Sequence, residues 1–144
     1  MIVVSAGMEK AGTGWYFNLT NDLLVLAGHS DVHIVRDQFR LQSILRHRNC
    51  NIGDLAMHKL LCAAIPHFLG RTFVVKTHGS PSRSLRLLMA LGIVRATYIY
   101  RDPRDVAVSA FEHGQKIRSS GEGHSFANLK DMEAAIIFAK QITD

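Results

Sequence analysis

Residues 2–15, "IVVSAGMEKAGTGW", decide the expected fold, because they combine a strand, a glycine-rich loop and the start of a helix. The short apolar and β-branched run at residues 2–6 predicts a buried strand. Apolar residues at helical spacing follow from Thr13, and Gly28 is a suitable C-terminal cap. The loop between them contains three glycines, Gly7, Gly12 and Gly14. Backbone N–H groups and the helix dipole at such a junction predict an anion-binding loop.

The loop has the glycine spacing of a Walker A loop, G-x-x-x-x-G-K-[ST], but it departs from that motif at two positions. Thr13 takes the place of the lysine, and Gly14 takes the place of the hydroxyl residue that binds magnesium. A lysine occurs earlier instead, at Lys10. The loop therefore favours a metal-free phosphate or phosphosulfate ligand over a magnesium nucleotide. Lys10 can neutralise charge on a leaving phosphate oxygen, as a metal ion does in other enzymes.

Strands and helices are expected to alternate along the rest of the chain. Further strands are expected over residues 31–36, 71–79 and 94–101, and helices over residues 37–48, 53–65, 80–92, 102–118 and 126–142. The helix over 37–48 would carry a basic face, and residues 119–125 would form a glycine-rich loop. Ser80 and Asp102 are expected to cap the helices that follow them. This order predicts one α/β domain over residues 1–144, with a P-loop-like parallel sheet and helices on both faces.

The composition is that of a globular protein, with 47% hydrophobic and 20% charged residues in a chain of 144. The sequence has no run of about 20 apolar residues and no basic, apolar leader, so we expect a cytoplasmic protein without membrane association. The formal net charge of +5 suits an anionic ligand. Cys50 and Cys62 are expected to be reduced thiols, and their spacing with His58 and His67 matches no zinc pattern.

Polar segments follow three of the expected strands, where ligands bind in parallel sheets. These segments are residues 7–14, 76–78 and 101–109. His78 has a side chain suited to a general base. Arg101 offers a fork of donors that fits a phosphate dianion, to which Ser109 can add a hydroxyl. A surface salt bridge with Asp105 is the alternative role for Arg101.

Together the three segments resemble motifs of the sulfotransferases that use 3′-phosphoadenosine 5′-phosphosulfate (PAPS). The phosphosulfate motif of that family is P-K-S-G-T-T-W, and residues 9–15 are "EKAGTGW". The 3′-phosphate motif is approximately Y-x-x-R-[DN]-P-[KR]-D-V-x-x-S, which residues 98–109, "YIYRDPRDVAVS", match fully. The catalytic-histidine segment is K-T-H, which residues 76–78 match.

The resemblance implies a role for each matching residue. Lys10 is similar to the lysine that contacts the bridging oxygen of the donor, and His78 to the base that takes the acceptor proton. Lys76 is similar to a lysine that assists the sulfuryl group. Arg101 and Ser109 resemble the pair that holds the 3′-phosphate. The 5′-phosphosulfate cradle would comprise Ala11, Gly12, Thr13 and Gly14, and Trp15 would pack near the adenine unless it belongs to the core.

The implied activity is transfer of a sulfuryl group from PAPS to a hydroxyl or amine of a small molecule or carbohydrate, without a metal. Glu9, Ala11 and Gly14 depart from the motif, which weakens expected donor affinity rather than changing the donor. The resemblance covers the first half of the family domain, so the sheet is expected to be incomplete, or completed by a second chain or a homo-oligomer. The alternatives are a non-catalytic nucleotide-binding module and a P-loop nucleotide kinase relative. A nucleic-acid partner is not expected, because no nucleic-acid reading motif is present.

Overall fold

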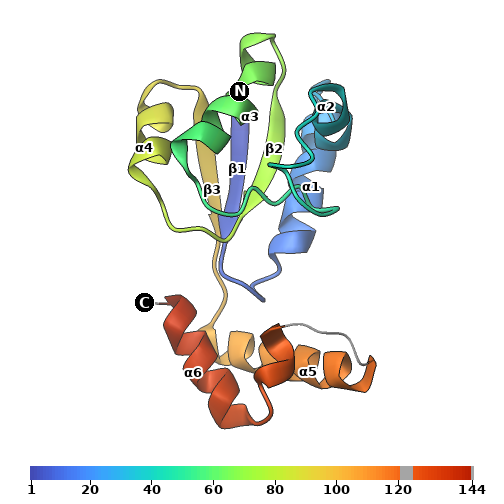
Figure 1. Cartoon of the computed structure of the whole chain (residues 1–144), viewed down its shortest axis with the longest axis vertical. Coiled ribbons are helices and arrows are strands. Elements are labelled where there is room, and N and C mark those ends of the chain that lie inside the picture. The colour runs from blue at the N-terminus through green and yellow to red at the C-terminus, as the bar shows by residue number, and fades with distance from the viewer. Residues whose placement is uncertain (121–124, 144) are drawn as a thin grey trace. The chain divides into compact units, whose positions relative to one another are not determined.

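The computed structural model describes residues 1–120 and 125–143 and has an α/β fold built on a parallel sheet (Figure 1). The strands are β1 (Ile2–Gly7), β2 (Phe73–Thr77) and β3 (Val94–Ile99), in the order β2-β1-β3. Ala6 pairs with Thr77 and Gly7 pairs with Ile99, so the carboxyl ends of all three strands lie at one edge of the sheet. The predicted α/β class and parallel sheet are confirmed.

The chain divides into two compact units. Unit 1 comprises Met1–Gly7 and Thr13–Ile99, and unit 2 comprises Met8–Gly12 and Tyr100–Asp144. Unit 1 contains the sheet with α1 (Thr13–Leu26), α2 (Val32–Gln38), α3 (Met57–Phe68) and α4 (Arg83–Ala90). Unit 2 contains the loop segment 8–12 with α5 (Pro103–Ser120), the 3₁₀ helix η1 (Ser125–Asn128) and α6 (Met132–Thr143). The anion-binding loop predicted from the sequence therefore contributes residues to both units.

The core of unit 1 covers β1 and β2 on both faces. Successive strand residues point to opposite faces, and nearly every residue of these two strands is buried. Helix α1 packs on β1 and β2, α2 on β2, α3 on β1 and on α4, and α4 on β3. Strand β3 is different, because Arg95, Ala96 and Tyr98 are exposed. The apolar composition of β1 and β2 follows from this burial on both sides.

Residues 31–36, which the sequence analysis predicted as a strand, form the first turns of α2. Asp31 has an extended backbone, and its side chain accepts a hydrogen bond from the backbone N–H of His33 at 2.7 Å. Val32 and Val35 are buried, and residues three positions apart lie on the same face of a helix. The strand prediction was wrong because a run of six residues with three β-branched side chains does not distinguish strand from helix, while the N-terminal cap of Asp31 favours the helix.

The helix predicted over residues 37–48 is also wrong, because α2 ends at Gln38 and turns follow. Arg40 and His47 have left-handed backbone conformations, with φ of 54° and 60°. The backbones of Arg46 and Asn51 exchange two hydrogen bonds of 2.9 Å, which closes the turn. These conformations break the helix, so the predicted basic helical face does not exist.

Three other helix boundaries differ from the predictions. Helix α3 begins at Met57 instead of residue 53 and contains Pro66 in its last turn. Helix α4 begins at Arg83, because the hydroxyl of Ser82, not Ser80, accepts the N-terminal hydrogen bond from Leu85 at 3.0 Å. The predicted last helix over 126–142 is divided into η1 and α6. The glycine-rich loop predicted at 119–125 falls partly outside the described residues.

None of the helices within residues 1–120 and 125–143 combines the length and the apolar character needed to cross a membrane.

Candidate functional site

Gly7 ends β1 where three segments of unit 1 pack closely. A Cβ atom at this position would lie 2.5 Å from Cγ2 of Ile99 and 2.7 Å from Cγ2 of Thr13. Real Cβ contacts do not reach such distances, so the first glycine of the loop is required by packing between β3 and the start of α1. Gly14 is different, because a Cβ atom there would meet nothing within 4 Å.

The loop segment 8–12 bends through two left-handed residues, Lys10 with φ of 63° and Gly12 with φ of 87°. The N–H of Ala11 donates a hydrogen bond of 3.3 Å to the carbonyl of Met8. A left-handed conformation costs a residue with a Cβ atom about 1–2 kcal/mol. Arg40, His47 and Cys50 adopt the same conformation outside the predicted site, so the conformation alone does not identify a ligand-binding segment.

Lys10 lies beside an aromatic ring and a second cation of unit 2. Its Nζ is 5.3 Å from the centroid of the Phe126 ring, within the range of a cation–π interaction. Burial lowers the pKa of Lys10 below its ordinary value of 10.5, Glu9 opposes this lowering, and the like charge of Lys116 adds to it. Phe126 and Lys116 were not predicted as site residues, because neither belongs to a local motif.

Arg101 lies close to the backbone of Lys10, so unit 2 brings together two of the predicted site residues. Its Nη1 donates a hydrogen bond of 3.4 Å to the carbonyl of Lys10. Its Nε lies 3.7 Å from Oδ2 of Asp105, so the alternative surface salt bridge is also present. Both side chains of this pair are largely exposed, and such pairs contribute about 0–1 kcal/mol. A phosphate dianion therefore has little to displace at Arg101.

Two further polar residues of the 98–109 segment have different surroundings. Ser109 is half-buried in α5, and within the described residues no hydrogen bond joins it to Arg101. Arg104 is paired with Asp102, with Nη2 and Oδ2 2.7 Å apart. The hydrogen bonds from Arg104 lower the pKa of Asp102 to about 2. Asp102 also accepts a bond of 2.9 Å from the N–H of Arg104, so this aspartate begins α5 and occupies Arg104.

In unit 1, His78 follows β2 and is fixed against the end of β1. Its Nδ1 lies 2.8 Å from the carbonyl oxygen of Gly7. The neighbouring Thr77 donates a hydrogen bond of 2.7 Å to the carbonyl of Gly53 and accepts one of 2.9 Å from the N–H of Gly79. These bonds fix the backbone on both sides of His78. The contact with Gly7 therefore orients the imidazole at the carboxyl edge of the sheet.

Lys76 lies within β2 and is 5% exposed. It is paired in register with Ser5 of β1, so the two side chains point to the same face of the sheet. Ser5 is fully buried, and its Oγ has no hydrogen-bond partner among the described residues. Ser5 was not predicted as a site residue, although a serine within an otherwise apolar strand is a usable signal.

The remaining loop residues have separate roles. Ala11 is 6% exposed and packs with Met8 and Val106 in the small core of unit 2. Thr13 is buried at the start of α1. Trp15 is 67% exposed, so the alternative that it belongs to the core is wrong. An exposed indole at this position is available to stack on a planar ligand.

The predicted residues therefore form two groups with different chemistry. Unit 1 holds Lys76, His78, Thr13, Gly14 and Trp15, and unit 2 holds Lys10, Ala11, Gly12, Arg101 and Ser109. The unit 2 group supplies cations and a bent backbone segment, which suit phosphate. The unit 1 group supplies an oriented imidazole. Within residues 1–120 and 125–143, no three His, Cys, Asp or Glu side chains are grouped to hold a metal ion.

Comparison of the chain with known proteins finds no matching family model, no matching curated protein and no matching solved structure.

Proposed function

We propose that this protein is a P-loop-like sulfotransferase that transfers a sulfuryl group from PAPS to an acceptor hydroxyl or amine. The observation that carries the proposal is the segment "YIYRDPRDVAVS", residues 98–109, which matches the 3′-phosphate motif at every defined position. The segments "EKAGTGW" and "KTH" precede it in the expected order. Each segment begins in a strand of the parallel sheet or within two residues of its end, and the carboxyl edge of such a sheet is where ligands bind.

In the proposed reaction, the acceptor oxygen or nitrogen attacks the sulfur atom of the donor. The bond between sulfur and the bridging oxygen breaks, and adenosine 3′,5′-bisphosphate leaves with that electron pair. His78 takes the proton of the acceptor, and Lys10 neutralises charge on the departing phosphate oxygen. Lys76 assists the sulfuryl oxygens. The proposal assigns no step to a metal, because the lysine supplies the positive charge.

The surroundings of the unit 2 residues support binding of a doubly phosphorylated ligand. Arg101 offers its guanidinium fork from a weak, exposed ion pair, and Lys10 and Lys116 add positive charge to the same unit. Ser109 supplies a hydroxyl donor for the 3′-phosphate. The Ala11 side chain packs in a core, so a phosphate contact at this position would require the N–H of Ala11 to exchange its 3.3 Å bond to the Met8 carbonyl for the ligand.

A transfer assay with a radiolabelled sulfuryl donor tests the activity directly. The acceptors are a panel of phenols, alcohols, amines and sugars, since the sequence does not define the acceptor. We expect label transfer to at least one acceptor and its loss in His78→Gln. The exposed His29→Gln is the matched control and should keep the activity. Transfer that is unchanged in His78→Gln would contradict the assigned base.

A non-catalytic nucleotide-binding module is the second candidate. The contact between Arg101 and Lys10 favours this candidate, because it joins two proposed phosphate-binding residues within unit 2. The proposed base, His78, belongs to unit 1 and takes no part in this contact. This candidate predicts binding of adenosine 3′,5′-bisphosphate without label transfer to any acceptor. A second chain that completes the sheet would fit either function, because β3 is an edge strand of the described sheet and pairs with β1 alone. Binding of ATP that depends on magnesium would instead favour a nucleotide kinase relative.

A further inference from the structure

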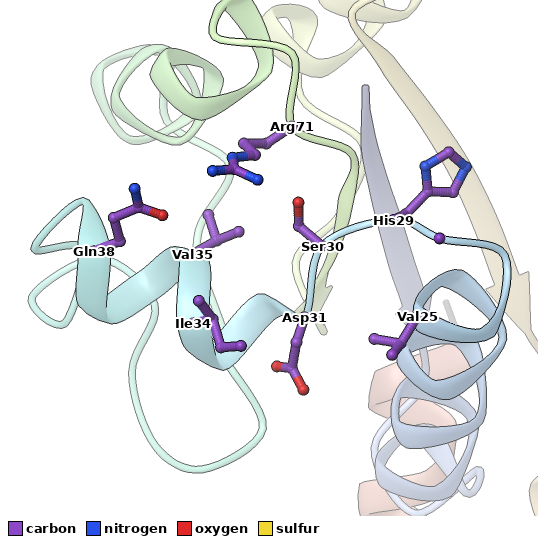
Figure 2. A pocket seen from close by; sticks show the side chains of 9 residues that line it. Val25, His29, Ser30, Asp31, Ile34, Val35, Gln38 and Arg71 are labelled. Carbon is purple, nitrogen blue, oxygen red and sulfur yellow. The ribbon is translucent and has the colours of Figure 1, made fainter.

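Unit 1 contains a pocket that shares no residue with the proposed site. Its volume is about 270 Å³, and it lies between the end of α1, the helix α2 and the residue Arg71 (Figure 2). Arg71 precedes β2 by two residues, so the pocket lies near the amino ends of the strands. Its lining includes the side chains of Val25, Ser30, Ile34, Val35, Gln38 and Arg71. None of them belongs to the motifs described above.

Three polar side chains meet on one side of this pocket. Figure 2 shows the guanidinium of Arg71 reaching toward Gln38, with the hydroxyl of Ser30 directed into the same space. The N–H of Ser30 donates a hydrogen bond of 3.0 Å to the carbonyl of Thr72, which holds Ser30 beside Arg71. Within the described residues, the side chains of these three residues make no hydrogen bond or ion pair. Their donors are available to a ligand oxygen.

The other side of the pocket is apolar. Val35 is 1% exposed and forms its floor, while Ile34 and Val25 are 67% and 42% exposed. Exposed aliphatic side chains beside a guanidinium favour a ligand with an apolar body and a polar end. The volume corresponds to roughly nine water molecules at liquid density, at about 30 Å³ each. A ligand of roughly ten non-hydrogen atoms therefore fits.

The charged side chains that line the pocket favour a monoanion over a dianion. Among the described residues that line the pocket, Arg71 is the only arginine or lysine, and His29 is the only histidine. Asp31 also lines it, but its Oδ1 accepts the bond from His33, and in Figure 2 its carboxylate points away from the Arg71 guanidinium. One guanidinium matches one carboxylate by two parallel hydrogen bonds. A nearby carboxylate disfavours a dianion such as phosphate.

We propose that this pocket is a binding site for a small monocarboxylate with an aromatic or aliphatic body. The carboxylate binds Arg71, Gln38 and Ser30, and the body packs on Val35 and Ile34. The site does not depend on the proposed function, because it shares no residue with the donor or acceptor groups. A small ligand with one charged end and few atoms binds in about the millimolar range.

Titration of the ¹⁵N-labelled protein with sodium benzoate, followed by amide NMR shifts, tests the proposal. Benzyl alcohol is the neutral probe of the same size, and inorganic phosphate is the anion without an apolar body. We expect saturable shifts at Ser30, Ile34 and Gln38 with benzoate, and at least fivefold weaker binding of the other two probes. Arg71→Gln should weaken benzoate at least fivefold, while Arg86→Gln, an exposed arginine of α4, should leave it unchanged.

Three results would overturn the proposal: equal binding of benzyl alcohol, stronger binding of phosphate, or benzoate shifts that persist unchanged in Arg71→Gln. The spectrum of each variant also reports its fold, so a loss of benzoate shifts is interpreted only alongside dispersed native signals. Ile34→Thr provides a second variant, which should weaken benzoate without changing the charge of the site. Because the pocket shares no residue with the proposed donor site, the benzoate result does not depend on whether the protein binds adenosine 3′,5′-bisphosphate.

Discussion

The imidazole Nδ1 of His78 lies 2.8 Å from the carbonyl oxygen of Gly7, which joins the end of β1 to the residue that follows β2. A carbonyl oxygen accepts hydrogen bonds and cannot donate them, so Nδ1 must carry the proton of this bond. In the neutral imidazole, Nε2 is then the basic nitrogen. The first glycine of the loop therefore fixes which atom of His78 can take a proton.

The protonation of His78 gives the first prediction. Long-range ¹H–¹⁵N NMR above the pKa of the imidazoles should show the proton of His78 on Nδ1. The exposed His29, which makes no side-chain hydrogen bond within the described residues, should show a mixture of tautomers and serves as the internal control. A proton found mainly on Nε2 of His78 would mean that the bond to Gly7 is absent in solution.

A pair of glycine substitutions tests why the loop begins with Gly7. Gly7→Ala places a methyl group 2.5 Å from Ile99 Cγ2 and should lower the free energy of unfolding by about 1–3 kcal/mol. Gly14→Ala adds a methyl group in open space at the start of α1 and should raise it by about 0.5–1 kcal/mol. Urea unfolding measures both values. Effects of equal size and sign in the two variants would refute the packing argument.

The charges around Lys10 should shift its pKa in opposite directions. Burial and Lys116 lower this pKa, and Glu9 raises it. Lys116→Gln should therefore raise the pKa of Lys10, and Glu9→Gln should lower it further. Titration of the side-chain NMR signals of Lys10 measures both shifts, with Lys130→Gln as the control. A shift in the same direction in both variants would show that one of the two charges does not act on Lys10 as described.

The pairing of Asp102 with Arg104 predicts a pH dependence with a definite sign. The pKa of Asp102 is about 2 in the folded chain, against 3.8 for an unpaired aspartate. Its stabilising contribution is present above about pH 3.8 and is lost as the pH falls through about 2. NMR titration of the Asp102 carboxyl should show this pKa, and Arg104→Gln should raise it. Arg101→Gln should leave it unchanged, and a shift of equal size there would contradict the assigned pairing.

The sequence predicted those features that depend on neighbouring residues. β1, the glycine loop and α1 follow from one apolar run, closely spaced glycines and helical periodicity, and the structure confirms the strand and the helix. The region from 31 to 48 could not be predicted, because Asp31 decides the helix by one capping bond and Arg40 and His47 adopt left-handed conformations that no pattern shows.

In the candidate site, too, the sequence predicted residues within local motifs but not the contacts between distant residues. Local motifs predicted Lys10, His78 and Arg101 as candidates. The sequence could not predict that Arg101 contacts the Lys10 carbonyl across 91 positions, or that Phe126 lies under the lysine, because these contacts form only in the folded chain. Arg104 matches the same motif as Arg101, yet its pairing with Asp102 distinguishes the two arginines.

Calorimetry with adenosine 3′,5′-bisphosphate tests the central claim most directly, because it requires no acceptor. We predict binding by the wild-type chain that is about 10- to 100-fold weaker in Arg101→Ala, as expected for a lost charge-assisted phosphate contact of about 1.5–3 kcal/mol. Binding of adenosine 5′-monophosphate should be unchanged in that variant, and Arg104→Ala should have little effect on either ligand. No heat from the folded protein at millimolar bisphosphate, or equal losses for both nucleotides in Arg101→Ala, would contradict the account.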